Sequence, residues 1–74
     1  MLSEITRDTI GFAAREIIKC EGGIESCLAR NTPASFLEIG IANAARNGHS
    51  AFVAEVRENR EEAEQIIAGI WGLM

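Results

Sequence analysis

Hydrophobic positions recur along this chain with helical spacing, three or four residues apart, in four segments separated by short polar breaks. The breaks are the Gly22-Gly23 pair, the Asn-Thr-Pro sequence at 31–33 and the Asn-Gly-His-Ser sequence at 47–50. Glycine and proline at such points interrupt regular structure. The pattern therefore predicts an all-α fold, a small bundle of three longer helices and one short helix.

The first two helices are expected at residues 3–21 and 24–30. Ser3 is suited to cap the first helix, because its hydroxyl can accept a hydrogen bond from a first-turn N–H. The apolar stripe of this helix includes Ile5 and Phe12 and covers close to half of its circumference. A helix that lies on one small core needs a narrower stripe. The extra width favours contact with a second molecule.

The third helix begins at a strong signal, with Thr32 as the N-cap and Pro33 at the first helical position. It is predicted to run to Asn47 and to end at Gly48, because glycine readily adopts the left-handed conformation of a C-cap. This helix is apolar nearly all round, which predicts that it is buried in the middle of the fold or of an assembly.

The fourth helix is expected to begin at Ser50 and to continue toward the C-terminus. A straight helix from Ser50 to Met74 spans about 37 Å, whereas a globule of this length is about 30 Å across. Either the helix breaks near Gly69 or Gly72, or its far end packs on another surface. We therefore expect a homodimer whose C-terminal segments meet across a two-fold axis.

The last turns of the chain are the candidate protein interface, because they hold the only tryptophan and tryptophan is enriched at interface hot spots. The residues in question are Ile66, Ile67, Ile70, Trp71 and Met74. The alternative for these side chains is the core of their own chain.

A polar, acidic stretch at residues 57–65 precedes the apolar end. Its carboxylates, with one from the preceding turn, form a candidate surface for a partner with a basic patch, since opposite charges speed encounter. These residues are Glu55, Glu58, Glu61, Glu62 and Glu64. The alternative is an ordinary solvated helix face.

Length and charge narrow the class of protein. Seventy-four residues predict one domain over residues 1–74, with a small core. The net charge of −4 and the scattered arginines argue against nucleic-acid binding, which needs a basic surface. No apolar run is long enough to span a membrane. The first residues carry Glu4, Arg7 and Asp8, which does not suit a secretory signal, so we expect a cytoplasmic protein.

Few residues are candidates for a catalytic or metal-binding role. Cys20 and Cys27 are expected to be small hydrophobic residues, although a turn at Gly22-Gly23 would also allow a disulfide. Together with His49, the only histidine, they match no metal-ligand spacing. No nucleophile–base pair or phosphate-binding glycine loop is present. We therefore expect no cofactor, no metal site and no enzymatic activity.

The sequence thus favours a small non-enzymatic protein of adaptor or inhibitor type, which acts by protein–protein interaction, as a homodimer. A first alternative is a small-ligand binder with a pocket at the dimer interface, where small residues would leave space. The residues that would form this space are Gly11, Gly40, Ala44 and Ala45. A second alternative is a DNA-binding regulator. It is disfavoured because Phe36 and Leu37 begin the would-be recognition helix, where polar and basic side chains are needed.

Overall fold

The computed structural model describes residues 1–73, and within that range it is all-helical, with five helices and no strand. The all-α prediction is confirmed. In chain order the helices are α1 (Glu4–Cys20), α2 (Ile24–Arg30), α3 (Pro33–Arg46), α4 (Ser50–Glu58) and α5 (Arg60–Ile70).

The predicted starts of the first and third helices are confirmed by their caps. The Ser3 hydroxyl accepts a hydrogen bond from the Thr6 N–H at the start of α1. Thr32 and Ser35 form a reciprocal capping box at the start of α3, with Pro33 in the first turn. Gly48, directly after α3, has a φ of 80°, a conformation that side-chain-bearing residues rarely adopt.

The predicted fourth helix is two helices, because the chain turns at Asn59. This residue has φ −124° and ψ 38°, outside the helical region, and its side-chain amide donates a hydrogen bond to the Glu55 carbonyl at 2.9 Å. An asparagine side chain that bonds to nearby backbone competes with helix continuation. α5 then ends at Ile70, before Gly72 with its φ of 77°, at one of the two expected break points.

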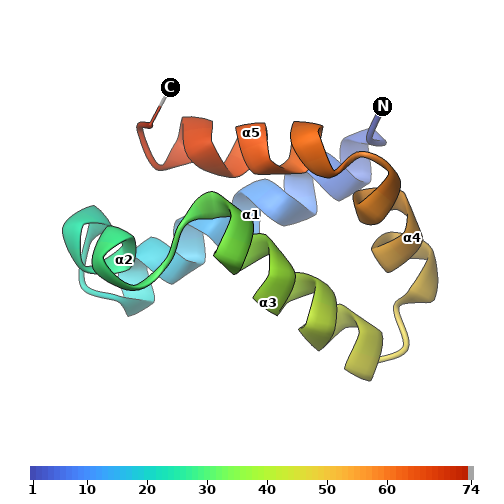
Figure 1. Ribbon diagram of the computed structural model, residues 1–74, viewed down its shortest axis with the longest axis horizontal. Coiled ribbons are helices and arrows are strands. Elements are labelled where there is room, and N and C mark those ends of the chain that lie inside the picture. Colours follow the sequence, from blue (N-terminus) through green and yellow to red (C-terminus); the bar gives the residue numbers. More distant parts are fainter. Residues whose placement is uncertain (74) are drawn as a thin grey trace.

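The turn at Asn59 removes the length argument for a dimer. Figure 1 shows α4 and α5 running in different directions, so no helix overshoots the fold. The longest dimension of the structure is 32 Å, close to the size expected for one compact chain. A homodimer remains a prediction, and it now needs a different physical reason.

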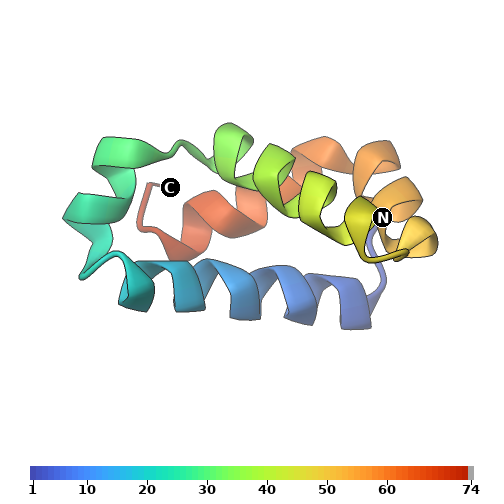
Figure 2. The same cartoon turned by 90° about the horizontal axis from the view of Figure 1, so that it is seen from below.

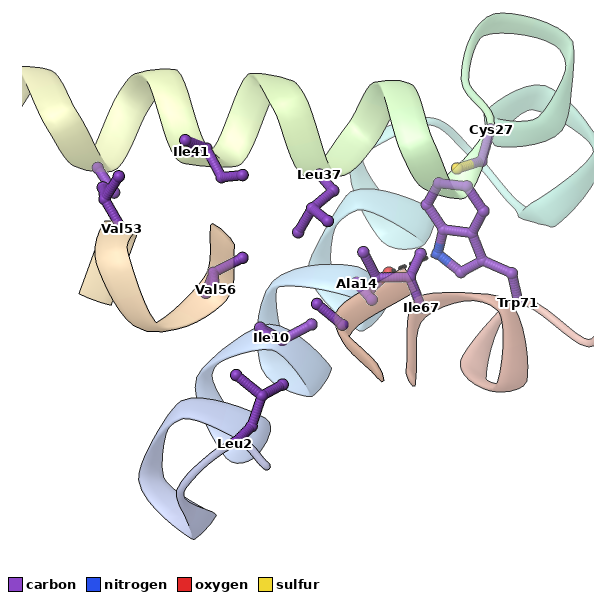
Figure 3. Packing of buried hydrophobic residues seen from close by; sticks show 12 residues of the cluster. Leu2, Ile10, Ala14, Cys27, Leu37, Ile41, Val53, Val56, Ile67 and Trp71 are labelled. Atoms are coloured by element: carbon purple, nitrogen blue, oxygen red, sulfur yellow. Dashed lines mark hydrogen bonds between the residues drawn. The ribbon is translucent and has the colours of Figure 1, made fainter. Parts of the chain in front are cut away.

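α5 is the central helix of the fold. It packs against both α1 and α3, while α2 packs on α1, and α4 packs on α3 and α5 (Figures 1 and 2). Within one chain α3 is not buried on all sides, since Ile39 and Gly40 are exposed, and its burial in an assembly stays a prediction. Twelve apolar side chains drawn from all five helices and the N-terminal segment form the core (Figure 3): Leu2, Ile10, Ala14, Cys27, Leu37, Ile41, Ala44, Val53, Val56, Ala63, Ile67 and Trp71.

Trp71 closes one end of this core. Its indole is only 3 % exposed, and its Nε1–H donates a hydrogen bond to the Ala14 carbonyl at 3.2 Å. The ring packs at 60° to Phe36, with the ring centroids 5.4 Å apart, and it lies beside Cys27 in Figure 3. A buried tryptophan with its N–H satisfied supplies a large apolar contact at no polar cost.

Candidate functional site

The apolar C-terminal residues are divided between the core and the surface. Ile67 and Trp71 are buried within their own chain, so they offer no free interface. Ile66 and Ile70 are half-buried and line a shallow groove between α1 and α5 beside Phe12. Met74 lies outside the described residues. An interface role therefore remains a prediction for Ile66, Ile70 and Met74.

Two of the predicted surface carboxylates hold the N-terminal segment in place. Glu55 accepts hydrogen bonds from the Thr6 hydroxyl and the Ser3 N–H, both at 2.6 Å. Glu62 accepts a hydrogen bond from the Leu2 N–H at 2.9 Å and pairs with Arg7 at 3.3 Å. These contacts draw Leu2 into the core and use both carboxylates within the chain. Glu55 and Glu62 are therefore unsuited to a partner surface.

The other three predicted carboxylates differ among themselves. Glu64 pairs with Arg60 at 3.6 Å, as the helical spacing predicts, and Arg60 also contacts Glu38. Glu58 and Glu61 are exposed and have no ion-pair partner within 4 Å among residues 1–73. Of the five predicted carboxylates, Glu58 and Glu61 are therefore the two that remain free for a partner among the contacts of residues 1–73.

The pKa of the Glu55 carboxyl is lowered, first by the hydrogen bond from the Thr6 hydroxyl and next by that from the Ser3 N–H. Because the folded pKa lies below the unfolded one, this stabilisation is complete above the unfolded pKa of about 4.3. It is lost as the pH falls toward the folded pKa. We expect Glu55→Gln to be less stable than the wild type at pH 7 and to lose less stability on acidification.

Urea unfolding followed by circular dichroism from pH 7 to pH 3 measures this difference. Glu58→Gln is the matched control, because Glu58 is an exposed carboxylate on the same helix and has no hydrogen-bond partner among residues 1–73. Its stability should follow the wild-type pH dependence. Equal pH dependence of Glu55→Gln and the wild type would contradict the assigned role of Glu55.

A hollow with a mainly apolar lining lies between α1 and α3. Its volume is about 440 Å³. The floor comes from three helices: Ile10 of α1, Leu37 and Ile41 of α3, and Ile67 of α5. Figure 2 shows α1 and α3 next to each other, with α5 behind them. The hollow exists because both helices pack on α5 and their facing sides are left uncovered by a further element.

Small residues form part of the walls of this groove, and Phe36 and Phe52 also line it. Gly40 and Ala44 of α3 line one side and Ala13 of α1 lines the other. A Cβ placed on Gly40 would meet no other atom within 4 Å, so this position opens into free space. Gly40 and Ala44 therefore leave room, as the sequence predicted. Gly11 instead lies against Ile70 on another side of α1, and the groove belongs to one chain rather than to a dimer interface.

One end of the groove is polar. Thr9, Asn43, Asn47 and His49 lie there. Asn47 donates a hydrogen bond to the Asn43 carbonyl at 3.0 Å, and Thr9 donates one to the Ile5 carbonyl at 2.9 Å. Two of the four polar side chains are thus bonded locally. The groove has an apolar body with a hydrogen-bonding end.

Three large apolar side chains of the two helices that form the groove are exposed to solvent without lining it. Ile5 and Phe12 of α1 are 79 % and 65 % exposed, and Ile39 of α3 is 59 % exposed. The sequence pattern pointed to Ile5 and Phe12 but not to Ile39. The sequence feature that indicated this exposed surface was the wide apolar stripe of the first helix, to which Ile5 and Phe12 contribute.

The described residues show no other cluster that suggests chemistry. Cys20 and Cys27 are both free thiols, and burial raises the pKa of the Cys27 thiol, with the nearby Glu21 carboxylate adding to the shift. Among residues 1–73, no three His, Cys, Asp or Glu side chains are grouped closely enough to hold a metal ion. No helix in this range combines the length and the apolar composition that crossing a bilayer requires.

Comparison with protein-family models, curated proteins and solved structures found no match to this chain.

Proposed function

We propose that this chain is a non-enzymatic protein-binding module of adaptor or inhibitor type, whose groove between α1 and α3 accepts an apolar helix of a partner protein. The observation that carries the proposal is the open groove with its apolar floor. Ile39, the neighbour of Gly40 in α3, is also exposed and supports it. Exposed apolar surface around a groove is typical of interaction sites.

The shape of the groove favours a helix as the bound element. Its α3 wall extends from Phe36 to Asn47, which corresponds to about 16 Å along the helix axis, or three turns. Ala13, Gly40 and Ala44 allow close approach of another helix, since they have little or no side chain. An amphipathic helix that lays its apolar face in such a groove is a common recognition mode.

Gly40→Leu is expected to fill the groove without harming the fold. The new side chain enters free space, and replacing a mid-helix glycine raises stability by roughly 0.5–1 kcal/mol. A synthetic uncharged amphipathic helix of Leu, Ala and Gln serves as the probe. We expect the wild type to bind it, with NMR shifts at Ala13 and Ile67, and Gly40→Leu to bind about tenfold more weakly or not at all.

Gly69→Leu is the matched control, because Gly69 is also a helical glycine with no atom within 4 Å of a new Cβ, and it does not line the groove. It should bind the peptide as the wild type does. Absence of binding to the wild type, or equal binding by Gly40→Leu, would overturn the assignment of the groove.

A small-ligand binder is the second candidate, favoured by the polar end of the groove at Asn43 and His49. A compact amphiphile would place its apolar part on Ile67 and its polar head at that end. Ligand that binds only the folded state raises the melting temperature. A rise with indole that is lost in Gly40→Leu, together with no response to the peptide, would favour this function over helix binding.

A further inference from the structure

The outer face of α1 is a second apolar surface, separate from the groove. α1 lies along one edge of the molecule, and the other helices all lie on one side of it (Figure 2). Ile5 and Phe12 are on the side turned away from the buried residues of this helix. They are seven residues apart, so they lie one above the other on the same face. This face is open along the length of α1.

Charged side chains line one flank of the same face in an ordered pattern. They are Glu4, Asp8, Arg15 and Lys19. Steps of four, seven and four residues keep all of them on one side of the helix. From the N-terminus the signs are two negative and then two positive. Glu4 and Lys19 form an outer pair, and Asp8 and Arg15 form an inner pair. Both pairs are centred on the same point of the helix, between Gly11 and Phe12.

Most of these charged side chains form no ion pair among residues 1–73. Among residues 1–73, no ion-pair partner lies within 4 Å of Glu4, Asp8 or Arg15, while Lys19 has a partner one turn away, Glu16 at 3.4 Å. The flank is therefore available to pair with charges of another molecule. Its sign pattern is the one that a reversed copy of the same helix would complement.

We propose that a second copy of this chain docks on this face, with the two α1 helices antiparallel about a two-fold axis beside Phe12. In such a pair, the same flank of each helix meets its counterpart, and the contacts are repeated by symmetry. Asp8 then faces Arg15 of the second copy. Glu4 faces Lys19 of the second copy, and the two Phe12 rings meet at the axis.

Charge complementarity favours this antiparallel arrangement over other ways of pairing two α1 helices. A parallel pair of α1 helices in register would place each charge opposite an identical one, and like charges across an interface are costly. The antiparallel register centred beside Phe12 makes all four facing pairs opposite in sign. The contact surface of one helix from each copy is small, so the dimer is expected to be weak and concentration-dependent.

This inference rests on the proposed function in that both assign protein–protein interaction to the chain, but it uses the outer face and not the groove. Two charge swaps with identical composition and net charge test it. Asp8→Arg with Arg15→Asp keeps every facing pair opposite in sign. Asp8→Lys with Lys19→Asp makes every facing pair alike in sign.

Sedimentation equilibrium should find a wild-type dimer that weakens as salt is added, since exposed charges are screened. The first swap should dimerise like the wild type, and the second about tenfold more weakly. Circular dichroism checks that both swaps stay folded. Phe12→Glu, a change at an exposed position, should also reduce dimerisation by about tenfold or more.

A wild type that stays monomeric at hundreds of micromolar would overturn the proposal. So would equal dimerisation by the two swaps, or a dimer that Phe12→Glu leaves unchanged. None of these results affects the peptide test of the groove with Gly40→Leu, so failure here and failure of the proposed function are distinguishable.

Discussion

Trp71→Ala is expected to lower the free energy of unfolding by about 3–5 kcal/mol, the usual cost of removing a large buried aromatic side chain. The indole is 3 % exposed and contacts α1 through the Ala14 carbonyl and α3 through the Phe36 ring. A chain of this length has a total stability of only about 4–11 kcal/mol. The substitution should therefore remove a large part of it.

Urea unfolding followed by circular dichroism measures this loss, since the variant has no tryptophan for fluorescence. Trp71→Phe keeps an aromatic ring but loses the N–H donor and some volume, so we expect about 1–2 kcal/mol. Phe12→Ala is the matched control, because Phe12 is an exposed aromatic residue and its removal should cost little in the monomer. Similar losses for Trp71→Ala and Phe12→Ala would contradict the assigned burial.

Leu2→Ala is expected to cost about 2–4 kcal/mol, although residue 2 precedes the first helix. Its side chain is 2 % exposed, and its backbone N–H is held by Glu62 at 2.9 Å. Removing the side chain leaves a cavity between the start of α1 and the α4–α5 turn. The fixed backbone restricts how far this site can collapse.

Thermal or urea unfolding of Leu2→Ala beside Ile5→Ala separates burial from hydrophobicity. Ile5 is an apolar residue of similar size only three positions away, but most of its side chain is in solvent. We expect Ile5→Ala to change stability by less than about 0.5 kcal/mol. If Leu2→Ala were equally mild, the N-terminal segment would not be part of the core.

Helix starts were predictable because their signals are local. Ser3 and the Thr32-Pro33 pair cap helices through contacts within four residues, and both work as the sequence indicates. The break at Asn59 was missed for the opposite reason. The surrounding stretch has high helix propensity, which hides the local hydrogen bond from the Asn59 side chain to the Glu55 carbonyl. The other contacts that hold the turn come from Leu2 and Ser3, more than fifty positions away. Tertiary contacts here override local propensity.

The candidate site was likewise predictable in its local features and not in those that depend on tertiary contacts. Gly40 and Ala44 were recognised as residues that leave space, which depends only on side-chain size. Their position in a groove within one chain depends on α1 and α3 sharing α5 as a support, and no local pattern encodes that. The amphipathic pattern also could not tell which turns of the C-terminal segment face inward. The structure buries Ile67 and Trp71 and leaves Ile66 and Ile70 at a surface groove.

The central position of α5 has a consequence for how the chain acquires its fold during synthesis. Among residues 1–73, α5 follows the other four helices in chain order, yet it is the one on which α1 and α3 both pack. A nascent chain that has emerged only as far as α4 can form local helices but lacks the element that joins them into one core. Until Arg60–Ile70 has left the ribosome, Ile10, Leu37 and Ile41 have no permanent cover. Folding should therefore be a cooperative step that waits for α5, and a chain stalled before α5 should be a good substrate for chaperones.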